Sequence, residues 1–425
     1  MLGIDSSFRA SSERSLVWWS AVMDDGRGYG RPVGISDPEL FQTGAGTPSG
    51  ELLRRYWQPV ALSSEATSIP REVRLLSEDL VLYRSLDGTP GLLEPRCCHR
   101  GTSLFYGRVE EDCIRCPYHG WAFSADGTCT DQPCEPDRGR NKSSYRQPWY
   151  PVQEFGGVIF TYMGPPEKQP DFPRYDIFED IGDDEEFHVV DHFAFGGPNV
   201  APCNWFQTHE NVMDPYHVFI LHNAISGPQF DPRLEIWPRI DWQRHEWGVT
   251  ATQDRELPDG TTLHRITETR LPNIRVVATP TLAYLGKTNN MSWAQPIDDT
   301  HTRVFCILRI PKGSPPQGLG TYGPDAKGWF DLTDEEHQTY PGDYETQVGQ
   351  GPITLHSEER LSSSDRGVSM VRRQYKEQIR IVAAGGDPMG VTFADAAPVE
   401  LVAGNYVIDG DTDFSVVPIA ETLDS

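Results

Sequence analysis

Two short segments containing cysteine and histidine constrain this chain more than any other feature of its sequence. Cys97 and His99 are separated by one residue, and after sixteen intervening residues follow Cys116 and His119, which are separated by two. Two thiolates and two imidazoles on two loops form a complete set of four ligands for a metal ion or an iron–sulfur cluster. We therefore expect the fold to bring the two segments together.

The cysteine spacing by itself leaves two kinds of metal site open. Cys113 and Cys116 have the spacing of a zinc knuckle, and Cys97 with Cys98 could supply further thiolates. A zinc knuckle would not require both histidines together with the Gly-Trp pair that follows the second segment, so we favour an iron–sulfur cluster. The other clustered cysteines are then expected to pack as small hydrophobic side chains: Cys113, Cys129 and Cys134.

The two segments, CCHRG at 97–101 and CPYHGW at 116–121, resemble the two-loop signature of Rieske domains. The resemblance implies a [2Fe–2S] cluster in which two cysteines hold one iron and two histidines hold the other. Glycines in both segments permit a close approach of the backbone to the cluster. Cys98 departs from the pattern, because many members of the family have proline there.

A second group of candidate ligands lies within residues 204–222. Asn211, Asp214, His217 and His222 are spaced Asn-x-x-Asp-x-x-His-x-x-x-x-His. Two imidazoles and one distant carboxylate would form a facial triad for Fe(II), with open positions for dioxygen and substrate. On a regular α-helix, residues five apart point about 140° away from each other. A local distortion or a helix end must therefore bring the two histidines together.

This spacing resembles the catalytic-iron motif of Rieske oxygenases, which implies that His217 and His222 are iron ligands. By the same resemblance Asp214 and Asn211 belong to the catalytic machinery. Asp214 would lie between His217 and a cluster histidine of a neighbouring subunit and couple the two centres electronically. Asp214 could also be an ordinary N-cap ahead of Pro215, and both roles could hold at once. His209 lies off the motif and is expected to be packed or at the surface.

The third iron ligand must be an acidic side chain much later in the chain. Residues 341–353, PGDYETQVGQGPI, resemble the carboxylate-bearing segment of the phthalate-dioxygenase-like branch. Asp343 is our choice of ligand there and Glu345 is the second candidate. Either acid could instead be a solvated residue at a helix start.

Apolar and turn-forming residues predict an α+β fold. Residues 58–165 carry short apolar runs between Gly, Pro and Asp turns and indicate an all-β Rieske domain. Residues 38–57 and 166–425 are expected to form the catalytic domain, preceded by an arm over 1–37. We expect a helix from the Thr47-Pro48 cap to Trp57, helical structure near 202–222, strands near 274–285 and 303–310, and a last helix capped by Ser364-Asp365 and ended by Gly385-Gly386.

The charge balance excludes some partners. The 425 residues include 62 acidic and 37 Lys or Arg side chains, a formal net charge of −25, which would repel nucleic acid and anionic membranes. No apolar stretch approaches the roughly 18 residues of a membrane-spanning helix, and the run from Leu16 to Met23 is too short. It also lacks a cleavage site for secretion, so we expect a cytoplasmic protein.

The resemblance covers residues 38 to about 390 and implies an aromatic ring-hydroxylating oxygenase of the phthalate-dioxygenase-like and O-demethylase branch. It implies a helix-grip catalytic domain, a homotrimer or dimer of trimers, and a separate flavin and iron–sulfur reductase that uses NADH or NADPH. Dioxygen and an aromatic carboxylate are the expected substrates, with hydroxylation or O-demethylation as the outcome. The rival hypothesis is a Rieske electron carrier whose C-terminal part is a non-catalytic binding domain.

Overall fold

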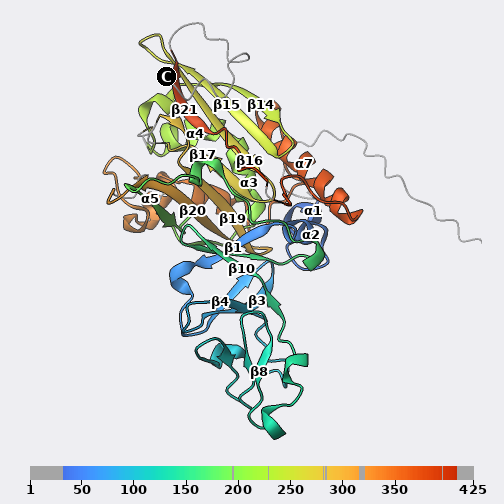
Figure 1. Ribbon diagram of the computed structural model, residues 1–425. Coiled ribbons are helices and arrows are strands. Elements are labelled where there is room, and N and C mark those ends of the chain that lie inside the picture. Colours follow the sequence, from blue (N-terminus) through green and yellow to red (C-terminus); the bar gives the residue numbers. More distant parts are fainter. Residues whose placement is uncertain are drawn as a thin grey trace, which may run out of the picture.

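The computed structural model describes residues 32–408, apart from 194–195, 228, 281, 283–284, 315–320 and 395. The run from Leu16 to Met23 and most of the predicted N-terminal arm lie outside this range. The molecule is elongated, with small β-sheets at one end and a large sheet with the helices at the other (Figure 1). No helix in the described part of the chain is both long and apolar enough to cross a membrane.

Three small antiparallel sheets form the narrow end of the molecule. The first has the order β1-β11-β10, the second β2-β3-β4-β9 and the third β5-β6-β7-β8. Their strands are β1 (Trp57–Leu62), β2 (Arg71–Leu75), β3 (Glu78–Arg84), β4 (Pro90–Leu93), β5 (Arg108–Val109), β6 (Ile114–Arg115), β7 (Ala122–Phe123), β8 (Cys129–Asp131), β9 (Trp149–Tyr150), β10 (Val152–Phe155) and β11 (Val158–Tyr162).

A ten-stranded antiparallel sheet forms the wide end, in the order β12-β20-β19-β17-β16-β15-β14, with β13 beside β20 and β21 beside both β16 and β18. Its strands are β12 (Glu185–Val190), β13 (Val200–Ala201), β14 (Arg239–Arg244), β15 (Gly248–Glu256), β16 (Thr262–Arg270), β17 (Ile274–Val277), β18 (Gly286–Lys287), β19 (Asn290–Asp298), β20 (His301–Pro311) and β21 (Gly404–Ile408). A small β domain beside a large antiparallel sheet with few helices confirms the predicted α+β class.

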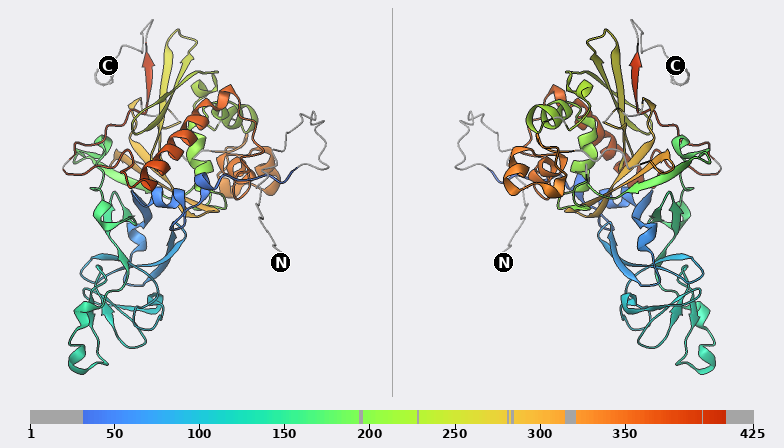
Figure 2. Two further views of the ribbon diagram at one scale, coloured as in Figure 1. Left: turned by 90° about the vertical axis from the view of Figure 1, so that its right-hand side faces the viewer. Right: turned by 90° about the vertical axis from the view of Figure 1, so that its left-hand side faces the viewer.

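The helices cover one side of the large sheet (Figure 2). They are α1 (Pro38–Phe41), α2 (Pro48–Leu53), α3 (Trp205–Glu210), α4 (Tyr216–Phe219), the π-helical η8 (Ile220–Ile225), α5 (Asp334–Thr339), α6 (Asp343–Gly349) and α7 (Arg366–Ala383). Short 3-10 turns are η1 (Ser63–Glu65), η2 (Leu104–Tyr106), η3 (Pro136–Arg138), η4 (Lys142–Ser144), η5 (Pro166–Lys168), η6 (Asp176–Phe178), η7 (Asn211–Met213), η9 (Pro232–Glu235), η10 (Trp329–Asp331) and η11 (Ser363–Asp365).

Helix α7 packs its apolar face against the core, as its spacing predicted. Val371, Tyr375 and Ile379 are buried in the largest hydrophobic cluster. The helix ends before Gly385, which has a positive φ of 81°. Asp365 is the N-cap residue of α7, as predicted, but its carboxylate accepts the backbone N–H of Ser362, which precedes η11, and makes no capping hydrogen bond to α7.

Two predicted elements end earlier than expected. Thr47 caps α2 as predicted, but the helix stops at Leu53, and Trp57 opens β1 because it pairs with Tyr162. The strand expected over 274–285 stops at Val277. Immediately beyond it, the carbonyl oxygens of residues 278 and 279 accept the guanidinium of Arg265, at 2.6 and 3.4 Å. The Arg265 side chain, from β16, thus occupies backbone acceptors that would otherwise bond the N–H groups of a neighbouring strand.

The narrow and wide ends share hydrogen bonds as well as apolar contacts. The backbone N–H groups of Leu76 and Ser77 donate to the carbonyl oxygens of Pro296 and Ile297, at 3.0 and 2.9 Å. Residues of β1, β3, β15 and α7 also contribute to one buried hydrophobic cluster. The small sheets are therefore joined to the large sheet by a continuous core.

Gly367 allows α7 to approach the segment that carries the predicted iron ligands. A Cβ at this position would lie 2.3 Å from Nε1 of Trp242 and 2.4 Å from the carbonyl oxygen of Met213. These two atoms form a hydrogen bond of 3.1 Å at the end of η7. The helix can thus pack here only because residue 367 has no side chain.

We predict that Gly367→Ala lowers the free energy of unfolding by about 1–3 kcal/mol, because the overpacking outweighs the roughly 1 kcal/mol gain in helix propensity. The matched control is Gly349→Ala in α6, where a Cβ meets nothing within 4 Å. Urea denaturation followed by circular dichroism measures both. Equal stability of the two variants would contradict this view of the packing.

Candidate metal centres

The two cysteine- and histidine-containing segments form a pair of matching turns at the tip of the narrow end. The N–H of Gly101 donates to the carbonyl oxygen of Cys97 at 2.8 Å, and that of Gly120 donates to the carbonyl oxygen of Cys116 at 3.1 Å. Both glycines have positive φ, 78° and 73°. Only glycine adopts this conformation readily, which explains its place in each segment.

The four predicted cluster ligands lie together between these turns. The rings of His99 and His119 are 4.6 Å apart, and His99 stacks on Trp121 at 4.5 Å. The buried thiols of Cys97 and Cys116 are within hydrogen-bonding reach of each other, and burial raises the pKa of Cys97 to about 12. A thiol in this environment stays protonated until a metal displaces its proton.

One orphaned atom tests whether these residues fit a cluster. Nδ1 of His119 is buried and has no hydrogen-bond partner among the described residues. A buried imidazole nitrogen without a hydrogen-bond partner lowers the stability of the folded protein unless it binds a metal or a cofactor. Together with two buried thiols and a second histidine it matches the ligand set of a [2Fe–2S] Rieske cluster.

Polar side chains brace both segments from outside. Oε1 of Gln147 accepts the N–H of Cys98 at 2.8 Å, and its Nε2 donates to the carbonyl oxygens of Glu94 and Arg96 at 2.7 and 3.0 Å. At the second segment, Arg115 donates to the carbonyl oxygen of Gly120 and to the carboxylates of Asp131 and Glu110. The segments are therefore held in place by residues that are not ligands.

The remaining cysteines of this region behave differently from one another. Cys113 and Cys129 are buried, as predicted for packed hydrophobic side chains. The same prediction is wrong for Cys134, which is exposed and lies 3.5 Å from the carbonyl oxygen of His119. Cys98, in the place of the family's proline, is also exposed.

The second group is built on a distorted helix. His217 lies in α4, and the chain then widens into the π-helical η8, which carries His222. The widening is marked by a hydrogen bond over five residues, from the N–H of Ser226 to the carbonyl oxygen of Leu221 at 3.1 Å. The histidine rings come to 5.3 Å from each other. The local distortion required by the spacing is therefore confirmed.

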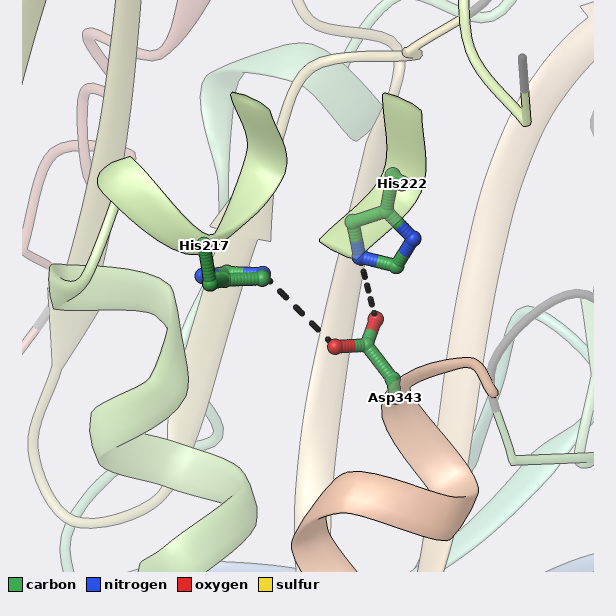
Figure 3. A group of neighbouring side chains, drawn as sticks. All are labelled: His217, His222 and Asp343. Atoms are coloured by element: carbon green, nitrogen blue, oxygen red, sulfur yellow. Dashed lines mark ion pairs between the residues drawn. The ribbon is translucent and has the colours of Figure 1, made fainter. Parts of the chain in front are cut away.

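Asp343, the first residue of α6, points between the two histidines (Figure 3). Its Oδ1 lies 3.6 Å from Nε2 of His217, and its Oδ2 lies 3.5 Å from Nε2 of His222. One ligand atom from each residue falls within 4.8 Å of the other two, and the three form the one group of this kind among the described residues. Two imidazoles and a carboxylate are the ligand set of a facial triad for Fe(II).

The outer nitrogens of both imidazoles are engaged by neighbouring oxygens. Nδ1 of His222 lies 2.6 Å from Oε1 of Gln229, and Nδ1 of His217 bonds the carbonyl oxygen of Asp214. An oxygen at Nδ1 places the proton there and leaves Nε2 as the metal-binding nitrogen. Burial alone would raise the pKa of Asp343, but the adjacent histidines, His222 foremost, hold it well below its usual range.

Two amides also approach the Asp343 carboxylate. Asn211 and Gln347 donate to its Oδ1, at 3.5 and 3.4 Å. The alternative acid, Glu345, lies elsewhere, because it accepts Nε1 of Trp329 at 2.7 Å and bonds His337 at 2.9 Å. The structure thus places Asp343, and not Glu345, beside the two histidines.

Asp214 and His209 complete the set of predicted positions. The Asp214 side chain remains about one-third exposed, and its carboxylate lies 3.9 Å from Nδ1 of His217. It does not cap α4, which has no side-chain cap. His209 is buried in α3 away from the group, and burial lowers its pKa to about 3.

A cavity of about 410 Å³ opens beside His217, His222 and Asp343. Its far wall is the large sheet, from which β12, β15, β16, β17, β19 and β20 all contribute side chains. The wall residues share no sequence motif, and they were not identified from the sequence. Alternation along a strand shows which residues share a face, but not that the face lines a cavity.

Comparisons with known proteins agree with this arrangement. The Rieske [2Fe-2S] domain family matches residues 56–154. The phenoxybenzoate dioxygenase subunit alpha of Ectopseudomonas oleovorans is 48% identical over 91% of this chain and 95% of its own. The tert-butanol monooxygenase / tert-amyl alcohol desaturase oxygenase subunit of Aquincola tertiaricarbonis is 36% identical, over 89% and 81%.

Two further matches extend the comparison. The 5,5'-dehydrodivanillate O-demethylase oxygenase subunit of a Sphingobium strain is 34% identical over 88% of each chain. Among solved structures, Pseudomonas putida CBB5 NdmA with caffeine aligns with a TM-score of 0.60 over 83% of this chain and all of that one. Its sequence identity is 18%, so it supports the fold alone.

Fold and site together define an iron-dependent oxygenase with an attached Rieske domain. The chain belongs to the Rieske non-heme iron oxygenases, as a terminal oxygenase (alpha) subunit of the phthalate-dioxygenase-like and O-demethylase branch. Members of this family use a Rieske [2Fe–2S] cluster and a mononuclear iron. The donor sets described above fit both.

We predict that Gln229→Leu weakens Fe(II) binding by about 10- to 100-fold, because His222 loses the oxygen that fixes its tautomer and ring orientation. Titration of the protein against a ferrous chelator measures the affinity without any turnover. The matched control is Gln243→Leu on β14, an exposed residue whose amide bonds only Asp241 among the described residues. Equal iron affinity in the two variants would contradict the role given to Gln229.

Proposed function

We propose that this chain is the terminal oxygenase of a multi-component system that hydroxylates or O-demethylates an aromatic carboxylate. The observation that carries the proposal is the group of His217, His222 and Asp343 at one wall of the 410 Å³ cavity. The three side chains point toward one another, and all three line the cavity (Figure 3). A metal held by them would therefore lie next to the space that a substrate can occupy.

Specific roles follow for the other predicted residues. Cys97, Cys116, His99 and His119 would hold the Rieske cluster, and His217, His222 and Asp343 would hold Fe(II), which when bound supplies dioxygen activation. Asn211 would keep the Asp343 carboxylate in place through its amide. The accompanying division of the chain is a Rieske domain over 58–165 and a catalytic domain formed by 38–57 and 166–425.

The distance between the two centres bears on the oligomer. The Rieske turns lie at the tip that carries β8, and α4 lies at the opposite, wide end, in all views (Figures 1 and 2). We infer that electrons reach the iron from the cluster of a neighbouring copy. Asp214, partly exposed beside His217, would bridge the two centres within a homotrimer or a dimer of trimers.

Electrons would enter this assembly from a separate protein. Family members work in multi-component systems with a separate reductase. We infer an NAD(P)H-dependent flavin and iron–sulfur reductase as the partner. A cytoplasmic location remains a prediction.

The substrate class rests on a relative that is 48% identical and on the cavity. That relative is named for phenoxybenzoate, an aromatic acid with two rings. Another relative is named for tert-butanol, so membership of the branch does not by itself require an aromatic substrate. A cavity of about 410 Å³ is of the size that binds drug-like molecules and accommodates aromatic rings. The rival electron carrier is not favoured, because the relatives are oxygenases.

Metal content is the first test. We expect about three irons and two acid-labile sulfides per chain. His222→Ala should retain the cluster with its visible absorption and lose the third iron. Two irons in the unaltered protein would support the electron carrier, and zinc would support a structural site.

Asp214→Ala should leave both metal centres assembled but abolish turnover with the reductase, because the bridge between copies is lost. Asp79→Ala is the control, since Asp79 is exposed on β3 and pairs only with Arg74 among the described residues. Iron content, cluster absorption and NADH-coupled product formation are measured together. Full turnover in the Asp214 variant would reject the bridging role.

A substrate panel with reconstituted reductase tests the substrate class. We expect coupled product formation with phenoxybenzoates, phthalate or methoxybenzoates. Because uncoupled enzymes consume NADH without oxygenating substrate, product and NADH are followed together. Turnover of unsubstituted hydrocarbons without activity on any aromatic acid would contradict the proposal.

A further inference from the structure

Arg275 is a charged residue in the cavity that nothing else in the structure explains. It lies in β17, between Ile274 and Val276, and its side chain lines the cavity. No ion pair or side-chain hydrogen bond involves its guanidinium in the described part of the chain, and its Nε is buried without a partner. The partial exposure of Arg275 is exposure to the cavity that it lines.

The other charged groups of the cavity wall are engaged. Asp191 pairs with Arg303 at 2.6 Å. Arg265 donates to Oδ1 of Asn405 at 2.6 Å and to backbone carbonyl oxygens beyond β17. Asp343 lies between the two histidines. Among the charged residues of the described wall, Arg275 is thus the one whose guanidinium has neither a hydrogen-bond acceptor nor an ion-pair partner.

A buried guanidinium without an anion is costly to the folded protein. Burial lowers the pKa of Arg275, and the nearby carboxylate of Asp343 and thiol of Cys306 only partly oppose this effect. Buried charges in proteins are otherwise paired or hydrogen-bonded. An unpaired one in a cavity, next to a candidate metal group, indicates that the missing anion arrives with a ligand.

The balance of charge in the cavity favours an anionic ligand. Arg265 and Arg275 contribute two positive charges, and Asp191 shares Arg303 with Glu65, so that these three residues together carry one net negative charge. Asp343 contributes one negative charge, which a ferrous ion at the group would more than offset. The rest of the wall is largely apolar, formed among others by the side chains of Val189, Val190, Phe230, Val277, Val304 and Leu308.

We propose that Arg275 binds the carboxylate of the substrate and that the cavity thereby selects aromatic monocarboxylates over their neutral analogues. The planar guanidinium can donate two parallel hydrogen bonds to a carboxylate, a geometry that lysine cannot match. The apolar part of the wall would hold the rings. This inference rests on the proposed oxygenase function and assigns the acid-binding residue within the same site.

The test compares an acid with its amide. Phenoxybenzoate, as the meta and para isomers, and the corresponding phenoxybenzamides are the probes, and the readout is the ratio of kcat/KM for acid over amide with reconstituted reductase. In Arg275→Met we expect this ratio to fall by roughly 30-fold or more, mainly through the KM for the acid, because the carboxylate loses its charged partner. Arg275→Lys should keep part of the ratio.

Thermal stability separates this role from a structural one. Replacing an unpaired buried charge by an apolar side chain of similar length should leave Tm unchanged or raise it. The control is Arg309→Met on β20, where the guanidinium pairs with Glu185. That variant should keep the ratio of acid to amide.

The outcomes distinguish failure of the proposed substrate class from failure of the role assigned to Arg275. A protein that prefers the amides over the acids contradicts the substrate class under the proposed function. A protein that prefers the acids, and keeps that preference in Arg275→Met, overturns the assignment of Arg275 alone. Loss of the preference in Arg275→Met, with the preference kept in Arg309→Met, supports it.

Discussion

The candidate iron-binding group of His217, His222 and Asp343 depends on a widening of the helix that carries both histidines. On a regular α-helix His217 and His222 would point about 140° apart, and no single ion could bind both. The π-helical η8 after α4 turns them to one side, where Asp343 of α6 meets both imidazoles. Gln229, Asn211 and the backbone at Asp214 then orient the donors. Helix α7 packs against the preceding turn η7, where Gly367 lies against Met213 and Trp242.

The elongated shape of the molecule sets the second constraint. The Rieske turns and the iron-binding group occupy opposite ends of one continuous body, joined by a shared core and by hydrogen bonds between residues 76–77 and 296–297. An electron path through a neighbouring copy is the arrangement that the geometry favours. The cavity beside the candidate iron-binding group contains the unpaired guanidinium of Arg275, whose positive charge is complementary to a substrate carboxylate.

Most of what could be predicted from the sequence came from the spacing of residues within short segments. The four predicted cluster ligands within residues 97–119 and the helical repeat of α7 are short-range patterns. The structure brings the four side chains together and buries the apolar face of α7, as expected. Asp343 and Glu345 are two residues apart, which on a helix separates their side chains by about 160° and places them on opposite faces. Only the packing of α6 shows which face meets the histidines. The ends of β17 and the role of Arg275 depend on contacts between strands, which no single segment encodes.

Mixed assemblies test most directly whether the working site spans two copies. His119→Ala removes a predicted cluster ligand, and His222→Ala removes a predicted iron ligand, so each variant alone should be inactive. If electrons cross between copies, assemblies formed from both variants should regain part of the turnover of the unaltered protein. If mixed assemblies form and remain inactive, while each variant keeps its other metal centre, the account of a site shared between two copies is contradicted.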